Sequence, residues 1–316
     1  MKIYYIAFLG LGSIGKRHLQ NVCSLLDARG DNYIIDLYRS SLNRTLPEEI
    51  ARCVSRQYLY TEQVKEGKIY DAVFVTNPTS MHYGAIQKFA SHAKSFFIEK
   101  PVFDSTDIDE SFFENIKDIS SYVACPLRYN PVLLYVKENI PYQKVFAVRA
   151  ISSSYLPDWR PEQDYRECYS AHRDMGGGVG LDLIHEWDYL THFFGIPEVC
   201  YCLHDKISNL EIDSDDIAIY IAKTNKTCIE LHLDYFGRET LRLLELFMPE
   251  ETIYCDITNG KVKYLKQGIT IELNSDRNSF QMNEIQHFFD IIDGKTDNDN
   301  DVRHAYDVLK LAKGEI

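Results

Sequence analysis

Three glycines near the start of the chain have the spacing of a turn that binds a dinucleotide. Residues 10–15 read GLGSIG, and they follow an apolar run and precede a segment with helical periodicity. The first glycine permits a tight turn, the second lets the main chain approach a diphosphate, and the third allows close helix–strand packing. The amides at the start of the helix then favour negative charge. The predicted contacts are Gly10, Gly12, Ser13, Ile14 and Gly15; the alternative is a tight turn without a ligand.

The end of the second predicted strand bears on which dinucleotide binds. NAD specificity usually depends on an acidic residue about twenty residues after the glycines. Asp36 lies within the strand and is expected to be too early to reach the ribose, whereas Arg39 and Ser40 lie at its end. A cation and a hydroxyl at that place can hold a 2′-phosphate. We therefore predict NADP as the preferred cofactor, with NAD as the alternative, in which Arg39 stacks on adenine.

Two further strand ends carry polar residues that would reach the same crevice. The run at 72–75 continues into Thr76, Asn77 and Pro78, and the run at 95–98 continues into Glu99 and Lys100. We predict that the first group binds ribose or nicotinamide together with His82, and that Glu99 and Lys100 line the same edge. The alternatives are a turn that caps the helix from His82, and a lysine that ends a strand in solvent.

A glycine run at 176–180 precedes a second pair of reactive side chains, Asp182 and His185. Their spacing of three predicts that both lie on one helical face. Because an imidazole titrates near neutral pH, His185 could exchange a proton during a reaction. The alternative is a buried histidine that packs beside Trp187.

Arginine and aromatic residues of the later chain form a candidate substrate site. A guanidinium binds carboxylate or phosphate well, so these residues could bind an anionic substrate, although each arginine could equally form a surface ion pair. No cluster of histidines and acidic residues suggests a metal, and we predict none. The candidate substrate residues are Arg128, Trp159, Arg160, Tyr165 and Arg166.

The elements that must position these residues differ between the two parts of the chain. Up to residue 126, short apolar strands alternate with helical stretches, which predicts an α/β domain with a doubly wound parallel sheet. From residue 127 to 316, strands joined by short turns predict an α+β domain with a mainly antiparallel sheet, followed by helices at 281–292 and 301–313. The acidic segment 293–300 is predicted to be a solvated connection.

The composition excludes several classes of protein. A chain of 316 residues with 45% hydrophobic and 26% charged residues is typical of a globular protein. The net charge of −13 disfavours binding to nucleic acid, and no apolar run reaches the roughly 18 residues of a membrane span. The eight cysteines lack the spacing of a zinc site. We interpret them as reduced thiols of a cytoplasmic protein.

Together, the glycine turn, the Thr76-Asn77-Pro78 turn, the Glu99-Lys100-Pro101 motif and the Asp182/His185 segment resemble the Gfo/Idh/MocA oxidoreductases. The resemblance covers nearly the whole chain. It implies a Rossmann domain followed by an open-faced sheet domain that makes a homodimer or homotetramer. One departure matters, because the family pattern is D-x-x-x-H and the spacing here is D-x-x-H.

The resemblance implies that Lys100 and His185 are catalytic, with a less secure role for Asp182. It implies an NAD(P)-dependent hydride transfer at a carbinol or keto carbon of a sugar or sugar derivative. The segment from Tyr155 to Ser170 looks like a branch associated with bacterial surface-sugar and sialic-acid-like biosynthesis. The alternative function is a non-catalytic dinucleotide sensor on the same scaffold, because a fold does not fix a function.

Overall fold

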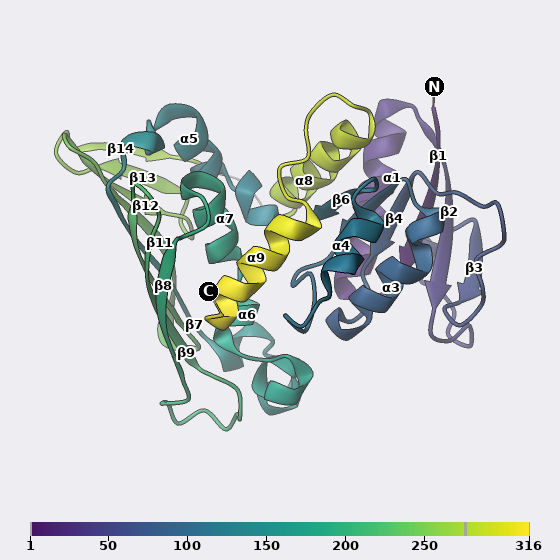
Figure 1. Cartoon of the computed structure of the whole chain (residues 1–316), viewed down its shortest axis with the longest axis horizontal. Coiled ribbons are helices and arrows are strands. Elements are labelled where there is room, and N and C mark those ends of the chain that lie inside the picture. Colours follow the sequence, from purple (N-terminus) through teal and green to yellow (C-terminus); the bar gives the residue numbers. More distant parts are fainter. Residues whose placement is uncertain (1, 275–276, 316) are drawn as a thin grey trace. The chain divides into compact units, whose positions relative to one another are not determined.

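The chain forms two compact units in the computed structural model, which describes residues 2–274 and 277–315 (Figure 1). The first unit contains the residues up to Pro126 together with Gln281–Tyr306, and the second contains Leu127–Phe280 and the residues from Asp307 onward. Residues 281–306 were expected in the second domain from the sequence. Within the described ranges, no helix has both the length and the hydropathy of a membrane span.

The first unit is built on a six-stranded parallel sheet with the order β3-β2-β1-β4-β5-β6. The order changes direction between β1 and β4, and ligands bind at such a point in sheets of this kind. The predicted doubly wound α/β fold is confirmed. The elements of this unit are β1 (Ile3–Leu9), α1 (Ser13–Arg29), β2 (Asn32–Arg39), α2 (Glu48–Ala51), β3 (Arg56–Leu59), β4 (Ala72–Val75), α3 (His82–Phe89), β5 (Ser95–Ile98), α4 (Glu110–Ile116), β6 (Ser120–Val123), most of α8 (Arg277–Ile292) and the start of α9 (Val302–Lys313).

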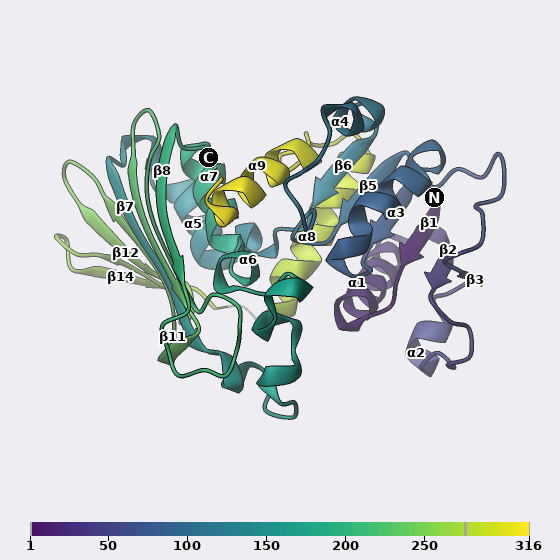
Figure 2. The same cartoon turned by 60° about the horizontal axis from the view of Figure 1, so that its bottom comes forward.

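Helices cover both faces of this sheet (Figure 2). Leu26 of α1 and Phe288 of α8 share one buried cluster with Phe74 of β4. Phe89 of α3 packs edge-on against Tyr38 on the opposite face of the sheet. Because α8 supplies apolar side chains to this core, residues 281–306 belong with the first unit even though they follow the second unit in the sequence.

The second unit is built on an eight-stranded sheet with the order β14-β13-β12-β11-β7-β10-β9-β8. Neighbouring strands are antiparallel except β7 and β10, so the predicted mainly antiparallel sheet is confirmed. The elements of this unit are α5 (Pro131–Asn139), β7 (Ala147–Tyr155), α6 (Val179–Asp182), α7 (His185–Phe194), β8 (Val199–Asp205), β9 (Ile217–Lys223), β10 (Cys228–Asp234), β11 (Phe236–Phe247), β12 (Thr252–Asp256), β13 (Lys261–Tyr264) and β14 (Ile269–Glu272).

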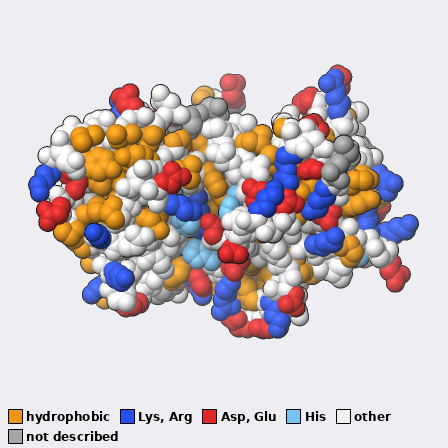
Figure 3. Space-filling view, turned by 90° about the horizontal axis from the view of Figure 1, so that it is seen from above, with side chains coloured by type: hydrophobic (Ala, Val, Ile, Leu, Met, Phe, Trp, Pro, Cys, Tyr) orange, Lys and Arg blue, Asp and Glu red, His pale blue; other side chains and the backbone are white. Residues whose placement is uncertain are grey.

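One face of this sheet carries α5, α6 and α7, and no helix of the described residues covers the other face (Figure 1). Tyr201 and Ile221 pair across β8 and β9 on the uncovered face, and they are 71% and 60% exposed. The next residue of β9 toward the amino terminus, Tyr220, is fully buried on the covered face. Hydrophobic side chains also gather over the second unit in the view of Figure 3.

The sequence patterns missed several elements. The short edge strand β3 was not predicted, nor was the helix α5 in the strand-rich half. The segment predicted as one strand at 252–273 forms the three strands β12, β13 and β14. Each miss concerns a short element, where a few residues give too weak a periodicity to separate helix from strand.

The acidic segment 293–300 is anchored to the first unit at its two ends, whereas residues 294–297 are exposed, so its prediction as a solvated connection holds only for its middle. Asp293 accepts hydrogen bonds from Lys2 at 2.9 Å and from the Tyr4 hydroxyl at 2.6 Å, and it also pairs with Arg29. At the other end of the segment, the Asn300 side-chain amide donates to the Val123 carbonyl at 2.7 Å.

The Asp293 cluster should make the stability of the protein sensitive to acid. Burial alone would raise the pKa of Asp293, but the groups that donate to it hold the pKa below its usual 3.8. A carboxyl whose pKa is lowered by folding stabilises the protein above its unfolded pKa of about 4, and this contribution is lost as the pH falls further. Asp293→Asn should therefore lower the free energy of unfolding by about 1–3 kcal/mol at neutral pH.

Urea denaturation at several pH values measures this effect. The difference between wild type and Asp293→Asn should shrink as the pH falls below about 4. Glu114→Gln is the control, because its ion pair with Lys117 is largely exposed and should contribute little. A difference that stays constant down to low pH would contradict the role of the Asp293 charge.

Candidate functional site

The glycine turn lies between β1 and α1 in the first unit, where the strand order changes direction. Gly10 has φ +89°, and a Cβ atom on it would lie 2.9 Å from the Cα atom of Asn77. A Cβ atom on Gly15 would lie 2.8 Å from the Thr76 hydroxyl oxygen, whereas one on Gly12 would meet nothing within 4 Å. The first and third glycines therefore allow tight packing, and the second faces open space.

The start of α1 and the neighbouring loop offer polar groups to a ligand. No side chain caps the amino terminus of α1, and its first turn contains no acidic residue. Both amide atoms of the Asn77 side chain are buried and have no hydrogen-bond partner within the part of the chain that the structure describes. Because buried polar atoms normally have partners, these groups fit a bound dinucleotide, whose diphosphate suits the helix terminus.

His82 and Thr76 stabilise this loop through hydrogen bonds to main-chain carbonyl oxygens. The ring nitrogens of His82 lie 3.0 Å from the Asn77 carbonyl oxygen and 3.1 Å from that of Pro101. The Thr76 hydroxyl donates to the Leu9 carbonyl at 3.1 Å. His82 thereby links the loop after β4 to the segment after Lys100. Burial lowers its pKa, although the hydrogen bonds and the charge of Glu99 oppose this.

Glu99 and Lys100 follow β5, which is the neighbour of β4 in the sheet. Lys100 is half-buried, and its peptide bond to Pro101 is cis. The Glu99 carboxylate is paired with His18 of α1 and accepts the main-chain N–H of Lys100 at 3.2 Å. Burial would raise the pKa of Glu99, but His18, with further help from the charges of Lys100 and His82, lowers it below 4.5.

The predicted preference for NADP rests on the residues at the end of β2. Arg39 ends the strand and donates to the Gln57 side chain and to the Arg44 carbonyl, both at 2.8 Å. Asp36 is fully buried within β2, where it pairs with Lys68 and accepts a hydrogen bond from Tyr70. Asp36 is therefore occupied inside the unit, and the strand end carries no acidic side chain at 39–41.

In the second unit, Asp182 and His185 lie on two different helices, which corrects the prediction of one helical face. Helix α6 ends at Asp182 and α7 begins at His185. Leu183 between them has φ −97° and ψ 28°, outside the range of an α-helix. Gly178, which precedes α6, has φ +131°, a value outside the helical range. Helix α6 therefore begins only after Gly178 and spans four residues.

Two tyrosines hydrogen-bond with the Asp182 carboxylate. The Tyr235 hydroxyl donates to Asp182 at 2.6 Å, and the Tyr169 side chain bonds to it as well. Burial, followed by the charge of Asp182, raises the pKa of the fully buried Tyr235, so its phenol stays protonated and donates. Neither tyrosine was predicted as a site residue, since the chain contains 22 tyrosines.

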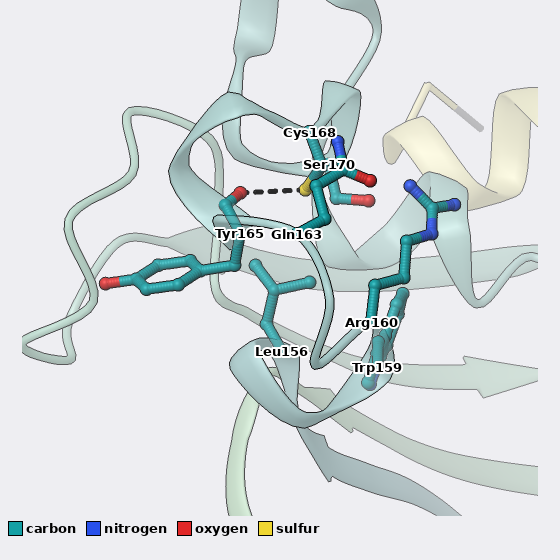
Figure 4. A pocket seen from close by; sticks show the side chains of 7 residues that line it. All are labelled: Leu156, Trp159, Arg160, Gln163, Tyr165, Cys168 and Ser170. Atoms are coloured by element: carbon teal, nitrogen blue, oxygen red, sulfur yellow. Dashed lines mark hydrogen bonds between the residues drawn. The ribbon is translucent and has the colours of Figure 1, made fainter.

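The predicted substrate residues of the second unit separate into two groups (Figure 4). Trp159 and Arg160 lie side by side along a small pocket. Trp159 packs edge-on against Tyr235, and the Arg160 guanidinium lies 5.8 Å from the centre of the Tyr169 ring. Both residues therefore contact a tyrosine that hydrogen-bonds with Asp182. The remaining lining residues are Leu156, Gln163, Tyr165, Cys168 and Ser170.

The other predicted substrate residues have partners within the chain. The Tyr165 ring points away from Arg160, and its hydroxyl accepts the Glu211 amide at 3.2 Å (Figure 4). Arg166 is exposed and forms ion pairs with Asp164 and Glu211, both at 2.8 Å.

Arg128 is buried and donates twice to Asp188, at 2.9 and 2.8 Å. Arg166 thus forms the surface ion pair that was the alternative to substrate binding, whereas the ion pair of Arg128 is buried. Among the described residues, no group of three or more histidine, cysteine or acidic side chains is placed to hold a metal ion.

Curated relatives match about two thirds of the chain. The inositol 2-dehydrogenase of Rhizobium meliloti is 24% identical over 221 residues, which cover 67% of this chain and 63% of that protein. The scyllo-inositol 2-dehydrogenase (NAD(+)) of Bacillus subtilis is 23% identical over 208 residues, which cover 64% of this chain and 57% of that protein. The match thus spans less than two thirds of the length of either relative.

Solved structures match nearly the whole chain and show its fold. The UDP-N-acetylglucosamine 3-dehydrogenase of Acidithiobacillus ferrooxidans has a TM-score of 0.76 at 17% identity, with 99% of this chain and 97% of that chain covered. A levoglucosan dehydrogenase in complex with NADH and levoglucosan has a TM-score of 0.77 at 13% identity, with 99% and 98% covered. Residues 4–114 also match the family described as "Oxidoreductase family, NAD-binding Rossmann fold". This part of the chain is therefore similar to the NAD-binding Rossmann domain of the Gfo/Idh/MocA oxidoreductases.

Proposed function

We propose that this protein is an NAD(P)-dependent oxidoreductase that interconverts a carbinol and a keto carbon of a sugar or sugar derivative. The observation that carries the proposal is in the first unit, where the open glycine turn follows β1 and the Asn77 amide, which has no partner among the described residues, follows the neighbouring β4. The next strand of the sheet, β5, leads to Lys100. The names of the similar dehydrogenases, which refer to inositols, levoglucosan and a sugar nucleotide, support a substrate of this class.

The chain's own residues would bind the cofactor and manage the hydroxyl proton. The glycine turn and the start of α1 would hold the diphosphate, while Asn77 would bind the nicotinamide half. A bound nicotinamide supplies the acceptor or donor of the hydride. When a carbinol carbon loses a hydride, its hydroxyl loses a proton, and we assign this proton to Lys100 and His185.

The second unit would supply substrate contacts in this proposal. Asp182 would accept a hydrogen bond from a substrate hydroxyl, with Tyr235 and Tyr169 fixing the carboxylate. Arg160 and Trp159 would contact the rest of the substrate, and the exposed guanidinium favours an anionic group such as the carboxylate of a sialic-acid-like sugar or the diphosphate of a sugar nucleotide. We leave Arg128 out of the substrate site because it is buried in its ion pair with Asp188.

A panel of substrates tests the proposed function. The purified protein is mixed with oxidised or reduced NAD and NADP and with inositols, simple sugars, UDP-N-acetylglucosamine and a sialic acid, while nicotinamide absorbance is followed. Turnover that requires both cofactor and sugar is the expected result. Tight cofactor binding without turnover on any member would favour the alternative of a dinucleotide sensor.

We further propose that NADPH binds more tightly than NADH. The end of β2 offers Arg39 and Ser40, and the nearest acidic residue of the strand, Asp36, is paired inside the unit. Arg39→Asp should shift the ratio of the two dissociation constants toward NADH by about tenfold, the effect of losing one charge-assisted contact of roughly 1.4 kcal/mol.

Fluorescence titration of both cofactors measures this ratio. Arg52→Asp is the matched control, because it makes the same charge change at an exposed residue just after α2. The control should leave the ratio unchanged. Equal constants for the wild type, or tighter binding of NADH, would contradict the proposed preference.

We also propose that the uncovered face of the second sheet joins two copies of the chain. Val199, Tyr201, Leu203 and Ile221 give this face apolar side chains that are 45–71% exposed, and apolar patches of this kind mark interaction surfaces. Light scattering should give a mass of two or four chains rather than of one 36.7 kDa chain.

A further inference from the structure

A buried hydrogen-bonded pair links α1 to the segment that carries Lys100. His18 of α1 is 1% exposed, and its Nε2 atom bonds to Oε1 of the Glu99 carboxylate. The second carboxylate oxygen of Glu99 accepts the main-chain N–H of Lys100 at 3.2 Å. All three residues belong to the first unit, so one chain of contacts joins the helix after the glycine turn to Lys100.

The surroundings of this pair make a purely stabilising role a poor explanation for it. The His18 ring packs edge-on against the buried Phe97 at 4.9 Å, and most of the other side chains that α1 buries are apolar. Burying a carboxylate is unfavourable unless its partners compensate, and apolar residues of similar volume often stabilise a protein as well or better. The pair therefore contributes something that an apolar contact would not.

The ionised carboxylate of Glu99 determines which side chain of the pair donates the hydrogen bond. An ionised carboxylate only accepts hydrogen bonds, so Nε2 of His18 carries the donated proton and the Lys100 N–H is the second donor. Burial opposes the ionised form of Glu99, but the hydrogen bond from His18, helped by nearby positive charge, lowers the pKa of Glu99. One carboxylate oxygen of Glu99 thus bonds to His18 of α1, and the other bonds to the main chain of Lys100.

We propose that His18 is a positioning residue, which fixes Glu99 and through it the main chain of Lys100 relative to the glycine turn. This inference rests on the proposed function, because it assumes that Lys100 acts on the substrate. A displacement of a catalytic group by a fraction of an ångström lowers the rate without abolishing binding. His18 and Glu99 should therefore influence turnover more than affinity.

Three variants separate positioning from packing. His18→Leu keeps an apolar volume but removes the donor, and Glu99→Gln removes the charge. His18→Gln places an amide donor near the position of Nε2. We expect the first two to lower kcat about 10- to 100-fold, with substrate KM and cofactor Kd within about threefold of the wild-type values. His18→Gln should restore most of the lost rate.

Asp36→Asn is the matched control, since Asp36 is another buried carboxylate of the same sheet and pairs with Lys68. It should lower the Tm without lowering kcat. If His18→Leu lowers the Tm and leaves kcat unchanged, the pair is only structural and the inference is overturned. An inactive His18→Gln variant that is as stable as the wild type would overturn it as well.

Hydrogen exchange of the protein without cofactor provides a readout that does not depend on activity. The Lys100 amide should exchange about tenfold faster in His18→Leu, in a peptide covering residues 96–104, while peptides from β1 keep their rates. Unchanged exchange at Lys100 would overturn the inference. A wild type that is inactive on every sugar, with the expected change in exchange, would instead overturn the proposed function and leave the positioning of Lys100 supported.

Discussion

Lys100→Ala should lower turnover by a factor of about 10² to 10⁴, the usual contribution of a positioned proton-transfer group. In the proposed mechanism, Nζ of Lys100 hydrogen-bonds the reacting oxygen and stabilises the charge that develops on it. The glycine turn and Arg39 lie on other segments of the first unit, so truncation of Lys100 leaves them in place. Cofactor affinity should therefore change by no more than a few fold.

Single-turnover hydride transfer, fluorescence titration of the cofactor and thermal melts together test the role of Lys100. Lys94→Ala is the control, because Lys94 lies just before β5 and its largely exposed side chain pairs with Asp71. That variant should keep the wild-type rate. A well-folded Lys100→Ala protein that remains fully active would show that Lys100 only ends a strand.

His185→Ala should reduce turnover by a similar factor, about 10² to 10⁴. His185 begins α7 and is partly exposed, in contrast to Glu186, which is fully buried with Arg242 as its partner. Since the proposal gives His185 and Lys100 the same reacting oxygen, the double variant should lose less than the product of the two single losses.

The competing account of His185 is that it packs against its neighbours. In that case His185→Ala would lower the Tm and leave the rate of hydride transfer unchanged. His232→Ala is the matched control in the second unit, because His232 pairs with Asp234 on β10 and has no role in the proposed reaction. A double variant whose loss equals the product of the single losses would argue against a shared oxygen.

The glycine turn could be predicted from the sequence because the spacing that defines it is local. The spacing of Gly10, Gly12 and Gly15 is itself the requirement for the turn, and parallel strands bring their carboxyl ends to one edge. The contacts of Gly10 with Asn77 and of Gly15 with Thr76 follow from β1 and β4 being neighbours in the sheet.

The substrate half could be predicted less well, because its contacts join residues that are distant in the sequence. Tyr235 bonds to Asp182 across 53 positions, and neither residue carries a pattern that would indicate its partner. The spacing of Asp182 and His185 suggested a shared helical face, yet the backbone at Leu183 leaves the helix. The ion pair between Arg128 and Asp188 likewise depends on tertiary packing.

The return of the chain to the first unit has a consequence for the order in which the protein can fold during synthesis. Phe288 and Phe289 of α8 emerge from the ribosome only after every strand of the second sheet has been made. Until then, the face of the first sheet that carries Phe8 and Phe74 lacks its α8 cover, and exposed apolar surface of this kind promotes aggregation of nascent chains. Residues 1–126 expressed alone would remain in that unfinished state.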